Sequence, residues 1–411
     1  MFNKALTLTA VILVLSACQL QADVIHSRWI GGEEGQWGDA SNWVPPIVPD
    51  NSSWRSFIVT IDSNSIGADK VDVYFQKNCN IDQLDCYGVL QLLCWPLEGI
   101  GLIVEDDVKG LTNHGTVNLD DGFMLVGNVV NQGRLAIEAQ AEVHGNIANY
   151  VFMEATGDVE IEGSVTNLAG AKALLGHEDS GTSIEGNLTN ATGGLIEVES
   201  WLNLGGDLDN AGRINLRAFV CKIDGDLINK GVLCTKVLVP ARIELAVDVK
   251  NSGTIEVNAG GGVAFDCNLV NEPNAVIKLL GGTLAATTIT QKAGAKFEGF
   301  GGITGNVVIE PRGVIKLSGP TNIVGNVEIK EGAMLDISDG TVLVTGLTRC
   351  NGTIRLKGGK IIPQGGLSGN CKIIPEPGAY TNTTDFNLDG QVDFKDFSSF
   401  AETWLQRQSW Y

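Results

Sequence analysis

Six residues near the C-terminus have the types and the spacing of a calcium loop. The stretch DFNLDGQVDFKD places them at loop positions 1, 3, 5, 7, 9 and 12, with Gly390 at position 6, where the loop must bend sharply. Oxygen ligands at alternate positions let one tight loop wrap a hard cation, with Gln391 contributing its backbone carbonyl. The sequence therefore predicts a calcium site made by Asp385, Asn387, Asp389, Gln391, Asp393 and Asp396.

A helix is predicted directly after this loop, because Phe397, Phe400 and Trp404 recur on one helical face. Asp396 stands where an EF-hand has Glu, and F-x-x-F-A-x-x-W-L follows, so the segment resembles a type I dockerin repeat. The resemblance implies a calcium loop–helix module over 385–411 that binds a cohesin-like or cell-envelope protein. The family has two repeats and this sequence spells one, as do many exported proteins of planctomycete-like bacteria. A second interpretation is a calcium-stapled helix that recruits no partner.

A repeat precedes this module and a linker at 375–384. The phrase Gly-(Asn or Asp)-aliphatic-x-Asn, then a small Gly-containing loop and alternating aliphatics, recurs through residues 101–374. The steps between successive phrases vary from 18 to 23 residues, which indicates a fixed core and loops of variable length. The asparagines that end the clearest copies are Asn113, Asn131, Asn149, Asn167, Asn190, Asn210, Asn229, Asn251 and Asn271.

These coils predict an all-β fold, a parallel β-helix (β-solenoid) with about 20 residues per coil. One coil cannot bury its apolar face alone, whereas stacked coils share a continuous core. Glycine is expected at corners with positive φ, and stacked asparagines are expected to form a hydrogen-bonded ladder. Leucine-rich repeats and an array of β-sandwiches are the alternatives, but these coils contain almost no helix-forming runs.

The segment 23–100 is predicted to be a Trp-rich cap with the first strands. Trp29, Trp37 and Trp43 lie in WIGGEEGQWGDASNW, which resembles the phrase W-x-G-G-x(4)-W-x-D-A-x-N-W. That phrase opens bacterial surface proteins that continue into β-solenoids, including autotransporter-like passengers. Three tryptophans with glycine turns would cover the open strand edges at the end of a solenoid. The alternative is a platform on which sugar rings stack.

Residues 1–22 are predicted to be an export signal, with Lys4 before an apolar stretch too short to span a bilayer. Either Cys18 is lipidated in a lipobox, giving an outer-membrane lipoprotein, or cleavage after Ala22 frees the chain. The location is therefore extracellular or at the cell surface. The later apolar stretch 89–104 is interrupted by polar residues, so no transmembrane span is expected.

The net charge bears on the possible partners, and the cysteine content bears on possible disulfides. The chain of 411 residues has a formal net charge of −20, which excludes nucleic acid as a partner. Eight cysteines follow Cys18, and Cys79, Cys86 and Cys94 are close enough in sequence to predict a local disulfide. Buried thiols that fill a core are the alternative.

The search for a catalytic site favours a non-catalytic protein. The acidic candidates, Asp106–Asp107, Asp120–Asp121, Glu178–Asp179 and Asp336 with Asp339, do not recur on successive coils so as to line a groove. We therefore expect an exported surface β-solenoid with a calcium-binding attachment module. The alternative is a carbohydrate-active protein: a polysaccharide lyase, a glycoside hydrolase or a glycan-binding protein delivered by its tail.

Overall fold

The computed structural model describes residues 23–376, apart from 53, 95–99, 106–109, 121, 139, 178–179, 218–219, 236–239 and 246–247. The predicted export signal, most of the linker and the calcium module lie outside these residues. The described chain is all-β and forms a parallel β-solenoid of about 14 coils with about 20 residues per coil, which confirms the predicted fold. The chain divides into two units: unit 1 comprises 1–135 with 141–145, and unit 2 comprises 136–140 with 146–411.

Three stacks of parallel strands, named here faces A, B and C, build unit 1. The two 3₁₀ turns are η1 (Ala40–Asn42) and η2 (Asn64–Ile66), and the unit boundary falls within β14 (Arg134–Ile137). Face A holds β1 (Asp23–Trp29), β4 (Arg55–Asp62), β7 (Gln83–Tyr87), β10 (Leu111–Asn113) and β13 (Val129–Asn131). Face B holds β2 (Glu34–Gln36), β5 (Val71–Phe75), β8 (Val89–Cys94) and β11 (Thr116–Asp120); face C holds β6 (Cys79–Ile81), β9 (Gly101–Val104), β12 (Met124–Val126) and β15 (Glu142–His144).

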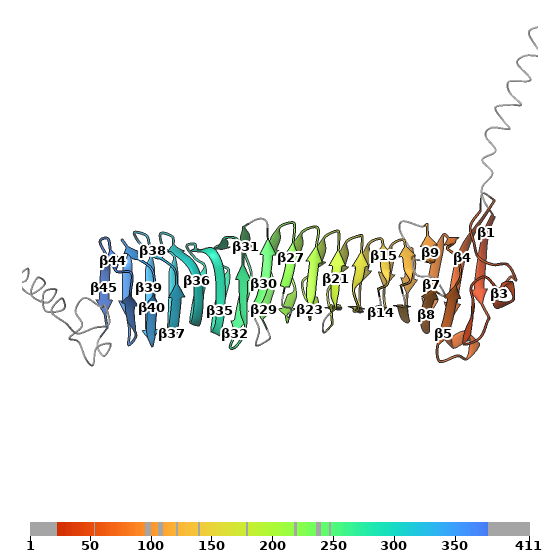
Figure 1. Cartoon of the computed structure of the whole chain (residues 1–411), viewed down its shortest axis with the longest axis horizontal. Coiled ribbons are helices and arrows are strands. Elements are labelled where there is room, and N and C mark those ends of the chain that lie inside the picture. The colour runs from red at the N-terminus through yellow and green to blue at the C-terminus, as the bar shows by residue number, and fades with distance from the viewer. Residues whose placement is uncertain are drawn as a thin grey trace, which may run out of the picture. The chain divides into compact units, whose positions relative to one another are not determined.

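Unit 2 has the same three faces, whose strands stack as successive rungs (Figure 1). Face A holds β16 (Ile147–Asn149), β19 (Val165–Asn167), β22 (Leu188–Asn190), β25 (Leu208–Asn210), β28 (Leu227–Asn229), β31 (Val249–Asn251), β34 (Leu269–Asn271), β38 (Val327–Ile329), β41 (Thr348–Cys350) and β44 (Leu367–Ser368). Face B holds β17 (Phe152–Ala155), β20 (Lys172–Leu175), β23 (Leu195–Val198), β26 (Arg213–Leu216), β29 (Val232–Thr235), β32 (Thr254–Asn258), β39 (Met334–Asp339), β42 (Thr353–Leu356) and β45 (Lys372–Pro375). Face C holds β18 (Val159–Ile161), β21 (Gly181–Ile184), β24 (Trp201–Leu204), β27 (Val220–Ile223), β30 (Pro240–Leu245), β33 (Gly262–Phe265), β40 (Thr341–Val344) and β43 (Lys360–Pro363). Three long strands continue from one face to the next: β35 (Val276–Gln291), β36 (Lys296–Ile309) and β37 (Val314–Val324).

The predicted asparagine ladder is present on face A. In unit 1 the Nδ2 of Asn113 donates to the Oδ1 of Asn131 at 2.7 Å. In unit 2 each ladder asparagine donates to the next at 2.8–2.9 Å, and every one is fully buried. Gln291 continues the series by accepting from Asn271 at 2.8 Å, which the repeat phrase did not predict. The ladder satisfies polar groups that would otherwise be buried unpaired.

A second, exposed series explains the Asn or Asp after the phrase's first glycine. Its side-chain oxygen accepts from the backbone N–H at the same position of the next coil. The Asn187 Oδ1 accepts from Asp207 N at 2.7 Å, and the Asp207 Oδ1 accepts from Asp226 N at 2.8 Å. Both ends of the repeat phrase therefore carry coil-to-coil hydrogen bonds.

The glycine after the ladder asparagine is required by close packing. A Cβ on Gly133 would lie 1.9 Å from the carbonyl oxygen of Gly115 in the preceding coil. Gly133 is not among the positive-φ residues, so the predicted corner role is wrong at this position. Gly127, at φ 134°, does have the left-handed backbone that was expected.

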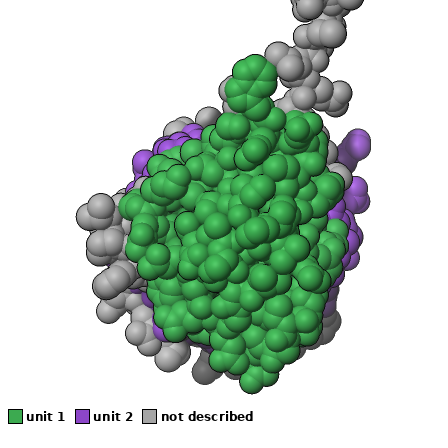
Figure 2. Space-filling model, turned by 90° about the vertical axis from the view of Figure 1, so that its right-hand side faces the viewer, with its two compact units in different colours: residues 1–135, 141–145 green, residues 136–140, 146–411 purple. Residues whose placement is uncertain are grey.

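The tryptophan cap closes the end of unit 1. Trp29, Trp37 and Trp43 are 0%, 0% and 1% exposed, and their indole N–H groups donate to backbone carbonyls at 2.8–3.1 Å. A Cβ on Gly31 would lie 2.7 Å from both Trp29 and Asn42, so the glycine of this phrase makes room for the buried ring. Figure 2 shows this end of unit 1 as a closed surface of side chains. The three rings cannot receive a sugar, so the sugar-platform alternative is wrong for them.

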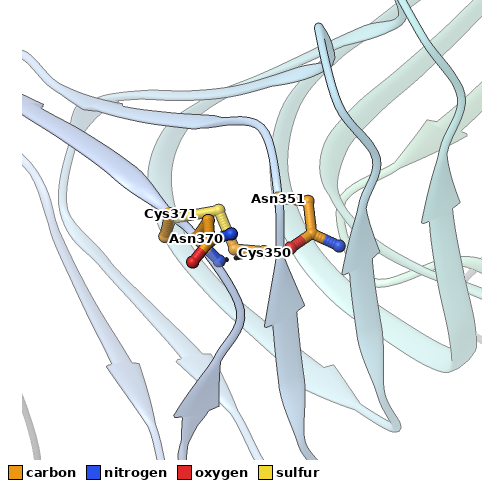
Figure 3. The surroundings of a disulfide bond; sticks show 4 residues. All are labelled: Cys350, Asn351, Asn370 and Cys371. Carbon is orange, nitrogen blue, oxygen red and sulfur yellow. Dashed lines mark hydrogen bonds between the residues drawn. A yellow bond between two sulfur atoms is a disulfide. The ribbon is translucent and has the colours of Figure 1, made fainter.

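The last coils of unit 2 are joined by a disulfide between Cys350 and Cys371, 21 residues apart (Figure 3). Cys350 ends β41 at the register position that follows Gln291, Ile309 and Ile329 on face A. The bond thus crosses between coils where the amide ladder has given way to other side chains. Closing a loop of this size stabilises a fold by about 3 kcal/mol, chiefly by restricting the unfolded chain.

The predicted local disulfide among Cys79, Cys86 and Cys94 is wrong. All three are buried thiols, as the alternative interpretation held. Their side chains point from strands of faces A, B and C into the core of unit 1. Burial raises the pKa of Cys79 to about 12, which keeps the thiol protonated at neutral pH.

Candidate functional site

The six predicted calcium ligands, Asp385 to Asp396, lie outside the described residues. The last described strand, β45, ends at Pro375, and the predicted loop comes shortly after it in the sequence. Within residues 23–376, as far as they are described, no three His, Cys, Asp or Glu side chains are grouped so that they could hold a metal ion.

Face B carries an acid–base cluster around Glu197, which is 8% exposed. Its carboxylate pairs with the Lys172 Nζ at 2.6 Å and accepts a hydrogen bond from Asn215 at 3.4 Å. Arg217 lies 4.0 Å from Glu197 and pairs more closely with Glu199, at 2.9 Å. The hydrogen bond from Lys172 lowers the pKa of Glu197 and outweighs the opposing effect of burial. This carboxylate is therefore ionised at neutral pH and already has Lys172 as its ion-pair partner.

Replacing Glu197 with Gln is expected to lower the free energy of unfolding by about 1 kcal/mol at neutral pH. Because the folded-state pKa is lowered, the carboxylate stabilises the fold above its ordinary pKa of 4.5, and this contribution is lost as the pH falls through the folded-state value. The difference between variant and parent should therefore disappear in acid, as followed by chemical denaturation. The exposed Glu160→Gln serves as the control, and a penalty that persists in acid would contradict the assignment.

A row of alternating charges follows on face B. Successive rungs place Glu256, Lys278, Glu298, Lys316, Asp336 and Arg355 in register. Asp336 is 3% exposed and pairs with Arg355 and with Lys357, the latter at 3.4 Å. Burial raises the pKa of Asp336, but the hydrogen bond and charge of Arg355, with Lys357, outweigh it and hold the pKa below its ordinary value.

Five of the acidic catalytic candidates lie outside the described residues: Asp106, Asp107, Asp121, Glu178 and Asp179. Of the described pair, Asp336 and Asp339, the structure engages each carboxylate separately. Asp339 is exposed and its carboxylate accepts from Gly340 N at 2.7 Å, apart from the ion pairs of Asp336. The His114 ring stacks on Tyr87 with centroids 4.6 Å apart, and His144 pairs with Glu142 at 3.0 Å. The two buried carboxylates on face B already have cationic partners, so the arrangement suits coil-to-coil stabilisation better than proton transfer.

A polar groove lies on face C of unit 2, and sequence reasoning missed it. Its volume is about 520 Å³, and Ser183, Asn203 and Lys222 line it from three adjacent rungs in register. Asp224 also lines it and pairs with Lys222 at 3.1 Å. Trp201, at the start of β24, is 51% exposed two residues before Asn203. The only signal in the sequence was a tryptophan at an outward strand position.

The described residues contain no helix with the length and apolar character needed to cross a membrane. Comparison of the chain with models of protein families, with curated proteins and with solved structures gives no match.

Proposed function

We propose that this protein is an exported, non-catalytic surface β-solenoid that is attached through a calcium-binding C-terminal module. The observation that carries the proposal is the sequence of the calcium loop at 385–396, which comes shortly after β45, the last described strand of the solenoid. The Cys350–Cys371 disulfide supports export, because such bonds persist in oxidising compartments.

The proposed partner is a cohesin-like or other cell-envelope protein. Calcium would order the loop and the helix after it, which presents the apolar face of Phe397, Phe400 and Trp404. Attachment would then depend on calcium. Residues 1–22 would direct export, either as a lipoprotein through Cys18 or as a secreted chain.

Calcium titration of the full chain tests the module. We expect saturable binding of one calcium ion and a gain of helical circular dichroism, both abolished by Asp385→Ala combined with Asp389→Ala. The control is Asp339→Ala, which removes an exposed solenoid carboxylate and should leave calcium binding unchanged. Binding that survives loss of the two loop aspartates would contradict the metal assignment.

Attachment is tested by capture from cell-envelope extract with the full chain as bait. A partner that is retained in calcium, released by chelator and absent with the loop variant would support the proposal. Capture that is indifferent to both chelator and the loop variant would contradict it, even if the loop binds calcium.

A further inference from the structure

We propose that Trp201 and the groove beside it bind a neutral polysaccharide. The proposal is independent of the calcium module, because it rests on described residues of face C in unit 2. The proposal starts from three observations: the volume of the groove, its polar lining and the exposed Trp201 indole.

The Trp201 ring is not needed to complete the core. Leu202 and Leu204, the inward residues of the same strand, are 2% and 1% exposed and fill the interior, whereas Trp201 points outward and is 51% exposed. Among the described residues its indole N–H has no hydrogen-bond partner, in contrast to the three cap tryptophans. Tryptophan is enriched at binding surfaces, because its ring offers a large apolar face and its N–H a hydrogen-bond donor.

The neighbouring rungs keep one side of the ring open. Gly181 pairs with Trp201 on the preceding rung and has no side chain to cover it. Gly205, the first residue after β24, also lines the groove. A Cβ on Gly205 would come within 2.5 Å of the Glu185 carbonyl oxygen, so only glycine fits here and no side chain fills this part of the groove. The aromatic ring and the polar groove thus lie on one open stretch of strand.

The polar groups suit sugar hydroxyls. Lys222 can donate hydrogen bonds, and the carboxylates of Glu185 and Asp224 can accept them. Ser183 and Asn203 can do both, so a sugar hydroxyl can find a partner whether it donates or accepts. Rungs about 4.8 Å apart place one polar side chain after another along the groove: Ser183, Asn203 and Lys222. Such a row fits a chain ligand better than a single compact one. The C–H faces of a pyranose ring would pack on the indole face.

The charge of the groove favours neutral over anionic polysaccharides. The groove has one cationic side chain, Lys222, against two carboxylates, Glu185 and Asp224, and the whole chain carries −20. A polyanion such as a uronate or sulfated polysaccharide would be repelled. The chemistry therefore points to a neutral pyranose polymer.

Affinity electrophoresis of the full chain in gels that contain a neutral polysaccharide tests the proposal. A β-glucan, a xylan and a galactomannan are the probes, and alginate is the anionic comparison. We expect retardation by at least one neutral polymer, weakened about tenfold or more by Trp201→Ala and largely kept by Trp201→Phe. The matched control is Trp54→Ala, which removes a tryptophan that is 60% exposed but does not line this groove.

Three results would overturn the proposal: no retardation by any neutral polymer, equal retardation of Trp201→Ala and the parent, or stronger retardation by alginate. Chelator should leave retardation unchanged, since the groove residues form no metal group among the described residues. Loss of glycan binding would leave the calcium titration intact, and loss of calcium binding would leave retardation intact. The two proposals therefore fail separately.

Discussion

Trp37→Ala is expected to lower the free energy of unfolding by about 3–5 kcal/mol. The Trp37 ring is fully buried, stacks on Phe75 with centroids 4.8 Å apart and meets the edge of Trp43 at 4.7 Å. Its indole N–H donates to the Pro49 carbonyl at 2.8 Å, so alanine would leave both a cavity and an unpaired carbonyl. The cap would lose the centre of its aromatic cluster.

Chemical denaturation of the variant and the parent measures this effect, with near-ultraviolet circular dichroism to follow the tryptophans. Trp54→Ala is the control, because Trp54 is 60% exposed and its loss should change stability by less than about 0.5 kcal/mol. If the two variants were equally stable, the buried tryptophans would not be what closes the end of unit 1.

Asn190→Leu is expected to cost about 3 kcal/mol, although leucine has a similar volume. Asn190 donates to Asn210 at 2.9 Å and to the Arg213 carbonyl at 3.1 Å, and it accepts from Asn167 at 2.9 Å. Leucine would leave the Asn167 amide N–H, the Asn210 amide oxygen and the Arg213 carbonyl without the hydrogen bonds that they make to Asn190. Because each amide bonds to the next coil, the loss falls on the contacts that hold the coils in register.

Hydrogen exchange of the full chain measures the Asn190→Leu effect locally, since a stack of repeats can open coil by coil. We expect faster exchange in the strands that flank the variant, β19 and β25, than in β41. Asn203→Leu makes the same change at an exposed site of the same coil and should leave those strands protected. Equal exchange in both variants would show that the ladder does not stabilise the stack.

The repeat phrase was sufficient to predict the solenoid and its ladder, because the same strands and the same buried amide recur from coil to coil. Each asparagine that ends the phrase, from Asn113 to Asn271, is fully buried on face A, where a buried amide must find partners. The cap was predictable for the same reason: three tryptophans near a solenoid end have few places to be buried.

Features that depend on which coils are neighbours could not be read from one phrase. The Cys350–Cys371 pair lies one coil apart, but eight cysteines allow many pairings and spacing favoured the wrong group. The charged row of face B needs the register of six separate rungs, so Glu256 and Arg355 are unrelated in the sequence. The Trp201 groove likewise joins β21, β24 and β27, and its polar residues look like ordinary surface when taken singly.

If the protein is held by its C-terminal module as proposed, the Cys350–Cys371 bond has a mechanical consequence. Tension applied beyond residue 376 would first peel β45 from β42, one backbone hydrogen bond after another. The peeling would then reach Cys371, where the load passes through a covalent bond to Cys350 and bypasses the loop between them. Residues 351–370 would thus be relieved of tension, and the load would pass directly from β45 to β41, which pairs with β38.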